Sequence, residues 1–376
     1  MLEQKQERNT NNMKVLQIIT SLHTGGAEKL IVDMCPLLKE RGHQVEVLLF
    51  DGTETPFKEE LRKANIRIYQ LSNGGFVYNP IFILKLISFL RKYDIIHTHN
   101  TACQYYTALA NLFSFSKVSL VTTEHSTYNR RRNIWCFKMI DKFIYKQYRI
   151  IISISNKSTE LLTTYLNRTK GIYTVLNGID LIRFRNAVAL DKKNFTYNSS
   201  PFLLTMVASF SEAKDQDTLI RAVSLLHGNY VLCLVGEGIR RSICEKLVKE
   251  LNIEQKVIFA GFRNDIPEML KTSDIIVLSS HWEGLSLSSL EGMSVGKPFI
   301  ASDVDGLHEI TEGAGILFSE GDAKQLAVEI QHLAEDKNYY SKIAEQCWKR
   351  VSQFNIQKTV DEYENLYQQC FYNNVY

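Results

Sequence analysis

The chain lacks an apolar run long enough to cross a bilayer, and its first dozen residues, MLEQKQERNTNN, lack the apolar core of a secretory signal. It also lacks any Cys-x-x-Cys pair, and its seven cysteines are odd in number and widely spaced. This pattern argues against a disulfide framework and a cysteine-based zinc site. We therefore expect a cytoplasmic protein in a reducing compartment, with residues 1–13 forming a polar N-terminal tail.

Neither sign of charge dominates the chain, whose net charge is +3, but the charges are distributed unevenly. Residues 1–180 hold 24 Lys and Arg against 15 Asp and Glu, so this half is basic and the remainder is acidic. A basic half predicts an acidic partner, such as an anionic membrane surface, a phosphate-bearing acceptor or nucleic acid. Nucleic acid is supported by charge alone, without a recognition motif, and we expect none as a partner.

Short β-branched runs alternate with amphipathic stretches along the 376 residues, a length sufficient for two cores. Such alternation predicts an α/β fold of parallel sheets with helices on both faces. The expected strands lie at 15–20, 44–50, 94–98, 118–122, 150–154, 202–207, 230–235, 257–259, 274–278 and 298–301.

The alternation pauses at a polar stretch and then starts again, which predicts two Rossmann-like domains with a binding cleft between them. The expected segments are an N-terminal domain over 14–185, a linker over 186–200, a C-terminal domain over 201–350 and a Tyr-rich helix over 351–376 that can cross back to the N-terminal domain.

Loops that follow strands are the places to search for a site, because open parallel sheets bind ligands at the carboxyl ends of their strands. Lys214 precedes an expected helix, whose N-terminus favours an anion such as a diphosphate. A solvated lysine is the simpler interpretation of this residue alone. Gly236 opens a Gly-x-Gly that permits close approach to a ligand, although an ordinary tight turn explains it equally well.

The most informative stretch is SSHWEGLSLSSLEGM, residues 279–293, which follows an expected strand and enters a helix. Glu283 lies in the loop and Glu291 about two turns into the helix, so their carboxylates can hold hydroxyls at two points of one ligand. The alternative is a capping loop whose acidic residues complement the helix dipole.

Residues 275–311, IIVLSSHWEGLSLSSLEGMSVGKPFIASDVDGLHEIT, resemble the donor-site signature of the GT4-type family of retaining glycosyltransferases, also called glycosyl transferases group 1. The TGGAE at 24–28 is similar to the N-terminal glycine loop of that family, and the LNGID at 176–180 to its asparagine-glycine turn. The resemblance covers residues 14 to about 335. It implies the GT-B fold, in which two Rossmann-like domains with parallel sheets face each other across a cleft.

The resemblance also implies roles for single residues. Glu283 and His125 are the catalytic candidates: Glu283 lies by the donor sugar, and a neutral His125 accepts a proton or bonds a sugar hydroxyl. Lys214 binds the diphosphate and Glu291 the ribose. The other implied contacts are Gly236, Arg263 by the base, and the backbone of Gly284, Leu285, Ser286 and Leu287 for the donor, with Gly25 and Gly26 for a phosphate or the acceptor.

One position departs from the family pattern. The family commonly places an arginine five residues before the diphosphate lysine, and this sequence has Ser209 there. The leaving diphosphate then has one cation fewer, unless Arg240, Arg241 or Arg263 substitutes.

The resemblance implies no metal and no cofactor, only a nucleoside-diphosphate sugar, with a UDP-sugar favoured by analogy. Asp303-Val304-Asp305 has the form of a metal motif, but it lies at a strand-to-helix turn and is interpreted as turn and cap chemistry. His97 and His99 lie on the same side of one strand. A zinc pair lacks a third ligand in the sequence, so a structural or acceptor-contact role is favoured.

Residues 130–149, RRRNIWCFKMIDKFIYKQYR, interleave cations with apolar residues. They can form a basic amphipathic helix on the inner face of the cell membrane, or a core-facing helix with a solvated basic side. We expect a glycosyltransferase of cell-surface polysaccharide synthesis that acts with retention on a hydroxyl of a glycan or lipid-diphosphate-linked acceptor. The alternatives are a non-catalytic GT-B-like subunit that assists a partner enzyme and a sugar-nucleotide epimerase.

Overall fold

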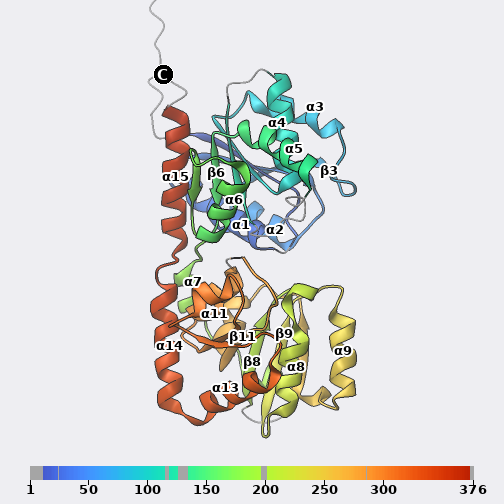
Figure 1. Ribbon diagram of the computed structural model, residues 1–376, viewed down its shortest axis with the longest axis vertical. Helices are drawn as coiled ribbons and strands as arrows, with labels where there is room; N and C mark the ends of the chain where they lie inside the picture. Colours follow the sequence, from blue (N-terminus) through green and yellow to red (C-terminus); the bar gives the residue numbers. More distant parts are fainter. Residues whose placement is uncertain are drawn as a thin grey trace, which may run out of the picture. The chain divides into compact units, whose positions relative to one another are not determined.

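The computed structural model describes residues 12–23, 25–114, 118–125, 134–195, 201–284 and 286–372. The chain divides into two compact units, one formed by Met1–Asn177 together with Ile356–Tyr376 and the other by Gly178–Asn355. Each unit contains one parallel sheet with helices packed against it (Figure 1). The α/β class that the sequence predicts is therefore confirmed.

The first unit has a seven-stranded sheet in the order β3-β2-β1-β4-β5-β6-β7. Its strands are β1 (Lys14–Ile19), β2 (Gln44–Asp51), β3 (Arg67–Ser72), β4 (Ile95–His99), β5 (Ser119–Glu124), β6 (Ile150–Ser153) and β7 (Ile172–Thr174). Its helices are α1 (Gly26–Glu40), α2 (Pro56–Lys63), α3 (Ile81–Leu90), α4 (Thr101–Ser114), α5 (Trp135–Lys146), α6 (Asn156–Leu166) and α15 (Ile356–Tyr372).

Both faces of this sheet are buried, which explains why its central strands are almost continuously apolar. Successive side chains of a strand point to opposite faces. In β1, Val15 and Ile19 pack with α1, α2 and α15, whereas Leu16 and Ile18 pack with α3, α4, α5 and α6. Gln17 has the parity of Val15 and therefore faces the same side as α1 and α15.

The second unit has a six-stranded sheet in the order β10-β9-β8-β11-β12-β13. Its strands are β8 (Phe202–Val207), β9 (Tyr230–Val235), β10 (Val257–Gly261), β11 (Ile275–Leu278), β12 (Phe299–Ser302) and β13 (Ile316–Phe318). Its helices are α7 (Leu181–Arg185), α8 (Gln216–Leu225), α9 (Arg241–Glu250), α10 (Ile266–Thr272), α11 (Leu287–Ser294), α12 (Leu307–Thr311), α13 (Ala323–Glu335) and α14 (Lys337–Val351).

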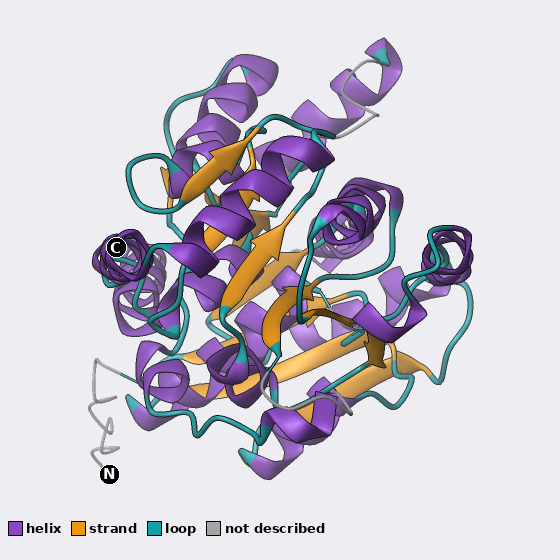
Figure 2. Cartoon of the chain, turned by 90° about the horizontal axis from the view of Figure 1, so that it is seen from below, coloured by secondary structure: helices purple, strands orange, loops and turns teal. Residues whose placement is uncertain are grey.

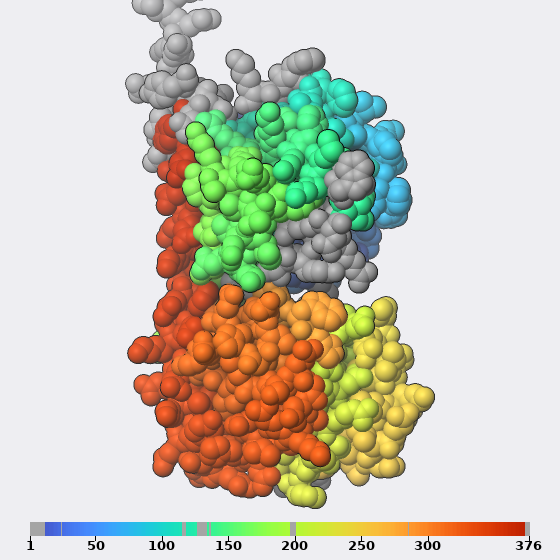
Figure 3. Space-filling view, viewed as in Figure 1, coloured from blue at the N-terminus to red at the C-terminus, as the bar shows by residue number. Residues whose placement is uncertain are grey.

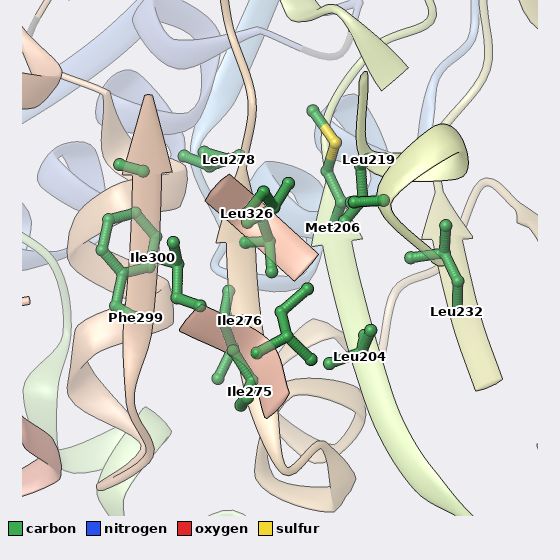
Figure 4. Close-up of a cluster of buried hydrophobic side chains, with 14 of the residues drawn as sticks. Leu204, Met206, Leu219, Leu232, Ile275, Ile276, Leu278, Phe299, Ile300 and Leu326 are labelled. Atoms are coloured by element: carbon green, nitrogen blue, oxygen red, sulfur yellow. The ribbon is translucent and has the colours of Figure 1, made fainter. Parts of the chain in front are cut away.

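The core of the second unit lies between its sheet and the covering helices. Figure 4 shows Leu204 and Met206 of β8 and Ile276 of β11 together with Leu219 of α8 and Leu326 of α13, all of them buried. Figure 2 shows helices on both sides of the strands. A close-packed core of this kind holds the strand ends, and thus the loops that follow them, in place.

The division between the units falls at Asn177 and Gly178, before the segment 186–200 in which the sequence predicts a linker. The described part of that segment packs on the second unit. Phe195 is buried in a cluster with Leu203, and the Leu190 amide donates to Thr272 Oγ1 at 2.7 Å. Two apolar anchors therefore attach a stretch whose polar composition resembles a linker. At the other end, α15 begins at Ile356 and belongs to the first unit.

Candidate active site

Each sheet has one position at which strand order reverses, between β1 and β4 in the first unit and between β8 and β11 in the second. Connections leave such a position in opposite directions, which opens a crevice outside the carboxyl ends of the two strands. Ligands of open parallel sheets bind at this point. The loops after β1, β4, β8 and β11 are therefore the places where side chains can meet a substrate.

In the second unit, the loops after β8 and β11 bring together the two residues that the sequence singles out most strongly. Lys214 ends the short helix Glu212–Lys214 after β8, and its Nζ forms an ion pair with Glu283 in the loop after β11. Ser280 Oγ donates to the same carboxylate at 2.8 Å. The side chain of Glu283 is only 9% exposed. These two residues are 69 positions apart in the chain, and they meet because β8 and β11 are neighbours.

The backbone holds these two loops against each other. The His281 amide donates to the Ala213 carbonyl at 2.8 Å, and Ser279 Oγ donates to the Asp215 carbonyl at 2.7 Å. Asp215 has a left-handed backbone, with φ of 45°, and its Oδ1 accepts from the Thr218 amide to cap α8. The position of Lys214 is thus set by a helix cap on one side and by the β11 loop on the other.

Helix α11 begins directly after this loop. Its N-cap residue is Ser286, which makes no side-chain cap hydrogen bond, and Leu287 is its first residue. The first amides of a helix have no partner within it and, with the helix dipole, attract an anion. Glu291 lies further along α11 and is half-buried. Gly284 lies beside the backbone of Gly306, whereas Leu285 lies outside the described residues.

The structure gives Gly236 a packing role. Its φ is 135°, and a Cβ at this position would lie 2.1 Å from the Ala208 carbonyl oxygen, so only glycine fits between the loops after β8 and β9. Its amide donates to the Gly261 carbonyl at 2.9 Å. That N–H group is therefore occupied within the protein. A contact of Gly236 with the sugar-nucleotide donor stays a prediction, and the hydrogen bonds described here do not support it.

Each arginine considered as a substitute cation is paired with a nearby carboxylate. Arg263 Nε lies 2.7 Å from Asp265 Oδ1, and this hydrogen bond lowers the pKa of Asp265. Arg240 pairs with Asp217 at 2.9 Å, and Arg241 pairs with Glu237 and Glu245. Ser209 lies near Ser211, with 3.5 Å between their hydroxyl oxygens. Among these candidates, Lys214 is the cation that lies at the switch point, where it pairs with Glu283.

The Asp303 carboxylate is also engaged locally. Its Oδ1 lies 2.6 Å from His308 Nδ1, and this hydrogen bond raises the pKa of His308. The pair joins the end of β12 to α12. The N-cap of α12 is Gly306, without a side-chain cap hydrogen bond, so the interpretation of the Asp-x-Asp pattern as turn and cap chemistry stays a prediction.

In the first unit, the glycine loop leads from β1 into α1. Gly25 is the N-cap residue and Gly26 the first residue of α1; Thr24 lies outside the described residues. Glu28, in the first turn, folds back over this N-terminus, so that a Cβ on Gly25 would lie 2.3 Å from Glu28 Oε2. Burial raises the pKa of Glu28.

His125 follows β5 on the side of the sheet that faces α1 and α15. Its Nε2 lies 2.8 Å from His99 Nδ1, and its Nδ1 is buried without a hydrogen-bond partner among the described residues. Burial lowers the pKa of His125 to about 4, so the ring is neutral near pH 7. His97 and His99 are fully buried, and burial holds their pKa values well below the usual range. Both ring nitrogens of each are taken by hydrogen bonds, a structural arrangement rather than a zinc pair.

The two units thus present different chemistry. The second unit offers a lysine, two carboxylates and a helix N-terminus, which suit a phosphate and sugar or ribose hydroxyls. The first unit offers a neutral imidazole with a free nitrogen and a glycine loop. Sequence reasoning missed Ser280 and Glu28, for which the second serine of the signature and the acid of TGGAE were the available signals.

Two family models match this chain. The model "Glycosyl transferases group 1" matches residues 189–350, and the model "Glycosyltransferase Family 4" matches residues 24–183. Together they account for most of the sequence, with one model on each half.

Known proteins with similar sequence or structure include glycosyltransferases. An N-acetyl-alpha-D-glucosaminyl L-malate synthase of Bacillus anthracis is 26% identical over 91% of this chain and 93% of its own length. A UDP-Gal:alpha-D-GlcNAc-diphosphoundecaprenol alpha-1,3-galactosyltransferase of Escherichia coli is 28% identical over 73% of this chain and 75% of its own. The crystal structure of Anabaena HepE in complex with UDP-glucose superposes with a TM-score of 0.82 at 22% identity, over 94% of this chain and 98% of that one.

Proposed function

Because the chain belongs to the GT4-type glycosyltransferase family, with the GT-B fold, we propose that it moves a sugar from a nucleoside-diphosphate sugar to an acceptor hydroxyl with retention. The observation that carries this proposal is the Lys214–Glu283 pair at the switch point of the second sheet, beside the uncapped N-terminus of α11. A cation and free amides suit a diphosphate, and a buried carboxylate suits a sugar hydroxyl.

In this reaction the bond between the anomeric carbon and the diphosphate oxygen breaks, and a bond to the acceptor oxygen forms on the same face. The acceptor hydroxyl gives up its proton, for which the leaving diphosphate and His125 Nδ1 are the available acceptors. Negative charge develops on the leaving diphosphate, where Lys214 and the first amides of α11 stabilise it. Glu291, which is half-buried on α11, is placed to hold the ribose hydroxyls. His125 is placed to bond a sugar hydroxyl or accept a proton.

We infer that the donor is a UDP-sugar and that the acceptor is a glycan or a lipid-diphosphate-linked sugar of cell-surface polysaccharide synthesis. The names of the similar proteins support this choice: UDP-glucose is bound in HepE, and the Escherichia coli relative transfers from UDP-Gal to a diphosphoundecaprenol-linked sugar. The basic character of residues 1–180 also suits a phosphate-bearing acceptor.

A lipid-linked acceptor would be reached at a membrane surface, and the first unit has a face suited to one. None of the helices in the described part of the chain has the length and hydropathy of a membrane span. On α5, however, Met139 and Phe143 are 66% and 51% exposed, beside the exposed Lys142 and Lys146. The only acid of this helix, Asp141, is buried and accepts from Tyr105 and Tyr165. Arg130, Arg131 and Arg132 lie outside the described residues.

The neighbouring helices expose apolar side chains as well. α3, α4 and α5 follow one another on the same side of the sheet and are adjacent in Figure 3. Leu84 on α3 and Phe113 on α4 are 69% and 66% exposed. We call the exposed residues Leu84, Phe113, Met139, Ile140, Phe143, Lys138, Lys142 and Lys146 the apolar-basic face. Its charge complements an anionic lipid surface on the inner side of the cell membrane, and its apolar side chains can enter the headgroup boundary.

The proposed function is tested by a thermal-shift screen of the full chain against UDP-, GDP- and ADP-sugars, followed by transfer assays with the stabilising donor. A donor at a hundred times its dissociation constant stabilises the fold by about 2.7 kcal/mol. Glu283→Gln is expected to lower turnover on the order of 100-fold, because a group that stabilises the transition state is lost.

Glu250→Gln, an exposed carboxylate at the end of α9, is the matched control and should leave turnover unchanged. Failure of every sugar nucleotide to stabilise the chain would reject the proposal in favour of a non-catalytic subunit. Isomerisation of the sugar nucleotide without an acceptor would indicate an epimerase instead.

A further inference from the structure

A row of polar side chains crosses the first sheet on the face that α15 covers. The parallel register pairs Gln17 with His97 between β1 and β4, and His99 with Thr123 between β4 and β5. The four residues are odd-numbered neighbours in register, so their side chains share one face. Tyr363 and Tyr367 of α15 lie over them and are fully buried. All of these groups are outside the donor site described above.

With the Gln17 amide oriented as in the structure, where its nitrogen donates to Tyr367, the hydrogen bonds of this row set which nitrogen of each ring carries the proton. Gln17 presents its amide oxygen to His99 Nε2 at 2.9 Å. An amide oxygen only accepts, so His99 Nε2 carries a proton and His99 Nδ1 is an acceptor. His99 Nδ1 in turn lies 2.8 Å from His125 Nε2. His125 Nε2 must therefore carry the proton, which leaves His125 Nδ1 with a free lone pair.

The other end of the row is compatible with this orientation of the Gln17 amide. Gln17 Nε2 donates to the Tyr367 hydroxyl at 3.0 Å, and that hydroxyl lies 2.6 Å from His97 Nδ1. His97 Nε2 lies 2.8 Å from Thr123 Oγ1. With Gln17 as the donor to Tyr367, the Tyr367 proton goes to His97 Nδ1 and the His97 proton goes to Thr123. Reversing the amide would require every later link to reverse as well.

The free atom at the end of the row is the one that can meet a substrate. His125 Nδ1 is buried and has no hydrogen-bond partner among the described residues, although a buried polar atom is normally satisfied. Gln17, His97 and His99 have partners at both ends of their side chains. The row therefore ends in one acceptor without a described partner, His125 Nδ1. This atom lies at the carboxyl end of β5, beside the switch point between β1 and β4.

We propose that Gln17, His99 and Tyr367 are positioning residues, which hold His125 in the tautomer with its proton on Nε2 so that Nδ1 accepts a hydrogen bond from a sugar hydroxyl. The ligand class, a carbohydrate hydroxyl, rests on the proposed glycosyl transfer; the tautomer itself does not. Tyr367 of α15 thus acts on His125 through two intermediate side chains, Gln17 and His99.

The tautomer is read directly from long-range proton–nitrogen correlation spectra of the full chain labelled with ¹⁵N-histidine, with His125 assigned by the signal lost in His125→Asn. The expected result for the unsubstituted protein is one His125 tautomer, with Nε2 protonated and Nδ1 bare. His99→Gln preserves a donor toward Gln17 and an acceptor toward His125, so it should retain that tautomer. His99→Leu and Tyr367→Phe should give a mixture of both tautomers.

Kinetics supply the second readout. His99→Leu and Tyr367→Phe should lower kcat/KM about fivefold to tenfold, the effect of one neutral hydrogen bond, and His99→Gln should restore most of the loss. Thr359→Val is the matched control, since Thr359 is buried on α15 and donates to the Leu176 carbonyl, outside the row. It should reduce thermal stability without changing the tautomer or kcat/KM.

A protonated Nδ1 on His125 in the unsubstituted protein would overturn the inference, as would a single unchanged tautomer in both His99→Leu and Tyr367→Phe. The spectrum of the unsubstituted protein decides even if a variant fails to fold. If no donor supports transfer, the proposed function fails while the spectra still test the row. If transfer occurs and Nδ1 is protonated, only the inference fails.

Discussion

At the scale of single residues, the first unit keeps three neutral histidines in its interior. His97 and His99 come from β4 and His125 from the end of β5, and the groups of α15 that face His97 are the Tyr367 hydroxyl and the Tyr363 ring. No described carboxylate hydrogen-bonds or pairs with any of the three rings in this arrangement. The rings are therefore desolvated, and no described carboxylate would compensate the positive charge that protonation adds. Protonation of these rings therefore destabilises the folded state.

Acid should destabilise the protein through these histidines. The pKa of His125 is lowered to about 4 in the fold, against about 6.5 in an unfolded chain. Between these values the unfolded state binds more protons, so the free energy of unfolding falls as the pH falls. His125 alone contributes about 3 kcal/mol over this window, and His97 and His99 act in the same direction. Denaturant unfolding at pH 7.5, 6.5, 5.5 and 5.0 measures the slope.

Two variants test whether His125 causes this dependence of stability on pH. His125→Asn should flatten the dependence of stability on pH over this range. His332→Asn, which changes an exposed histidine stacked on Tyr339, should leave the slope as it is. An equally steep slope in His125→Asn would mean that the acid sensitivity arises elsewhere.

The sequence identified the residues whose signals are local. Lys214 precedes a helix and Glu283 follows a strand, and the structure brings the two together. The positioning residues were not identifiable in this way, because Gln17 and Tyr367 are 350 positions apart and neither lies in a motif. The histidines at 97 and 99 were noticed, but their partners depend on the strand register and on where α15 docks. The roles assigned to the candidate site residues, Lys214, Glu283 and His125 included, stay predictions.

At the scale of elements, α5 combines the two interpretations that its sequence left open. Its inner side, with Ile144 and Tyr145, packs in the core, while Met139, Ile140 and Phe143 remain exposed beside the lysines. A core-facing helix whose outer side is only solvated carries polar residues at such positions instead of apolar ones. Clustered exposed apolar side chains commonly mark an interaction site, so their exposure favours a membrane surface that covers them.

The apolar-basic face should bind anionic vesicles. Phosphatidylglycerol vesicles are expected to sediment the full chain at low salt, with binding weakened by salt because the lysines act through charge. The double change Met139→Ser and Phe143→Ser should reduce binding severalfold, since it removes buried apolar area from the bound state. Co-sedimentation measures both effects.

A double change at exposed apolar residues of the second unit, Ile239→Ser and Val328→Ser, is the control and should bind as the parent does. Neutral vesicles provide the second comparison. Absence of binding to anionic vesicles at low salt would reject the membrane proposal and leave the transfer reaction untouched.

The strands that the sequence predicts are all present, with ends shifted by at most two residues, and those it misses are β3, β7 and β13. All three are edge strands. An edge strand carries less of the core, so its pattern is weaker: Arg67 and Gln70 are exposed in β3, and β7 has three residues without a fully buried one. The division between the compact units lies ahead of the expected linker, and Leu190 and Phe195 anchor that polar stretch on the second unit.

At the scale of the whole molecule, transfer should not depend on a divalent metal. The candidate metal motif uses its first carboxylate, Asp303, to hold His308, and Lys214 is placed to neutralise a diphosphate. Turnover of the full chain in excess EDTA is expected to equal that in buffer, and added manganese should have no effect. Loss of turnover in the chelator with recovery in manganese would contradict this.

Helix α15 has a consequence for how the protein is made. The ribosome completes all of Gly178–Asn355 before Tyr363 and Tyr367 emerge, yet these two side chains cover Gln17 and His97, which belong to strands made near the start of synthesis. Until then, those buried polar groups have no partner from α15. The unit whose first strand is translated earliest is thus the last to have all of its residues available.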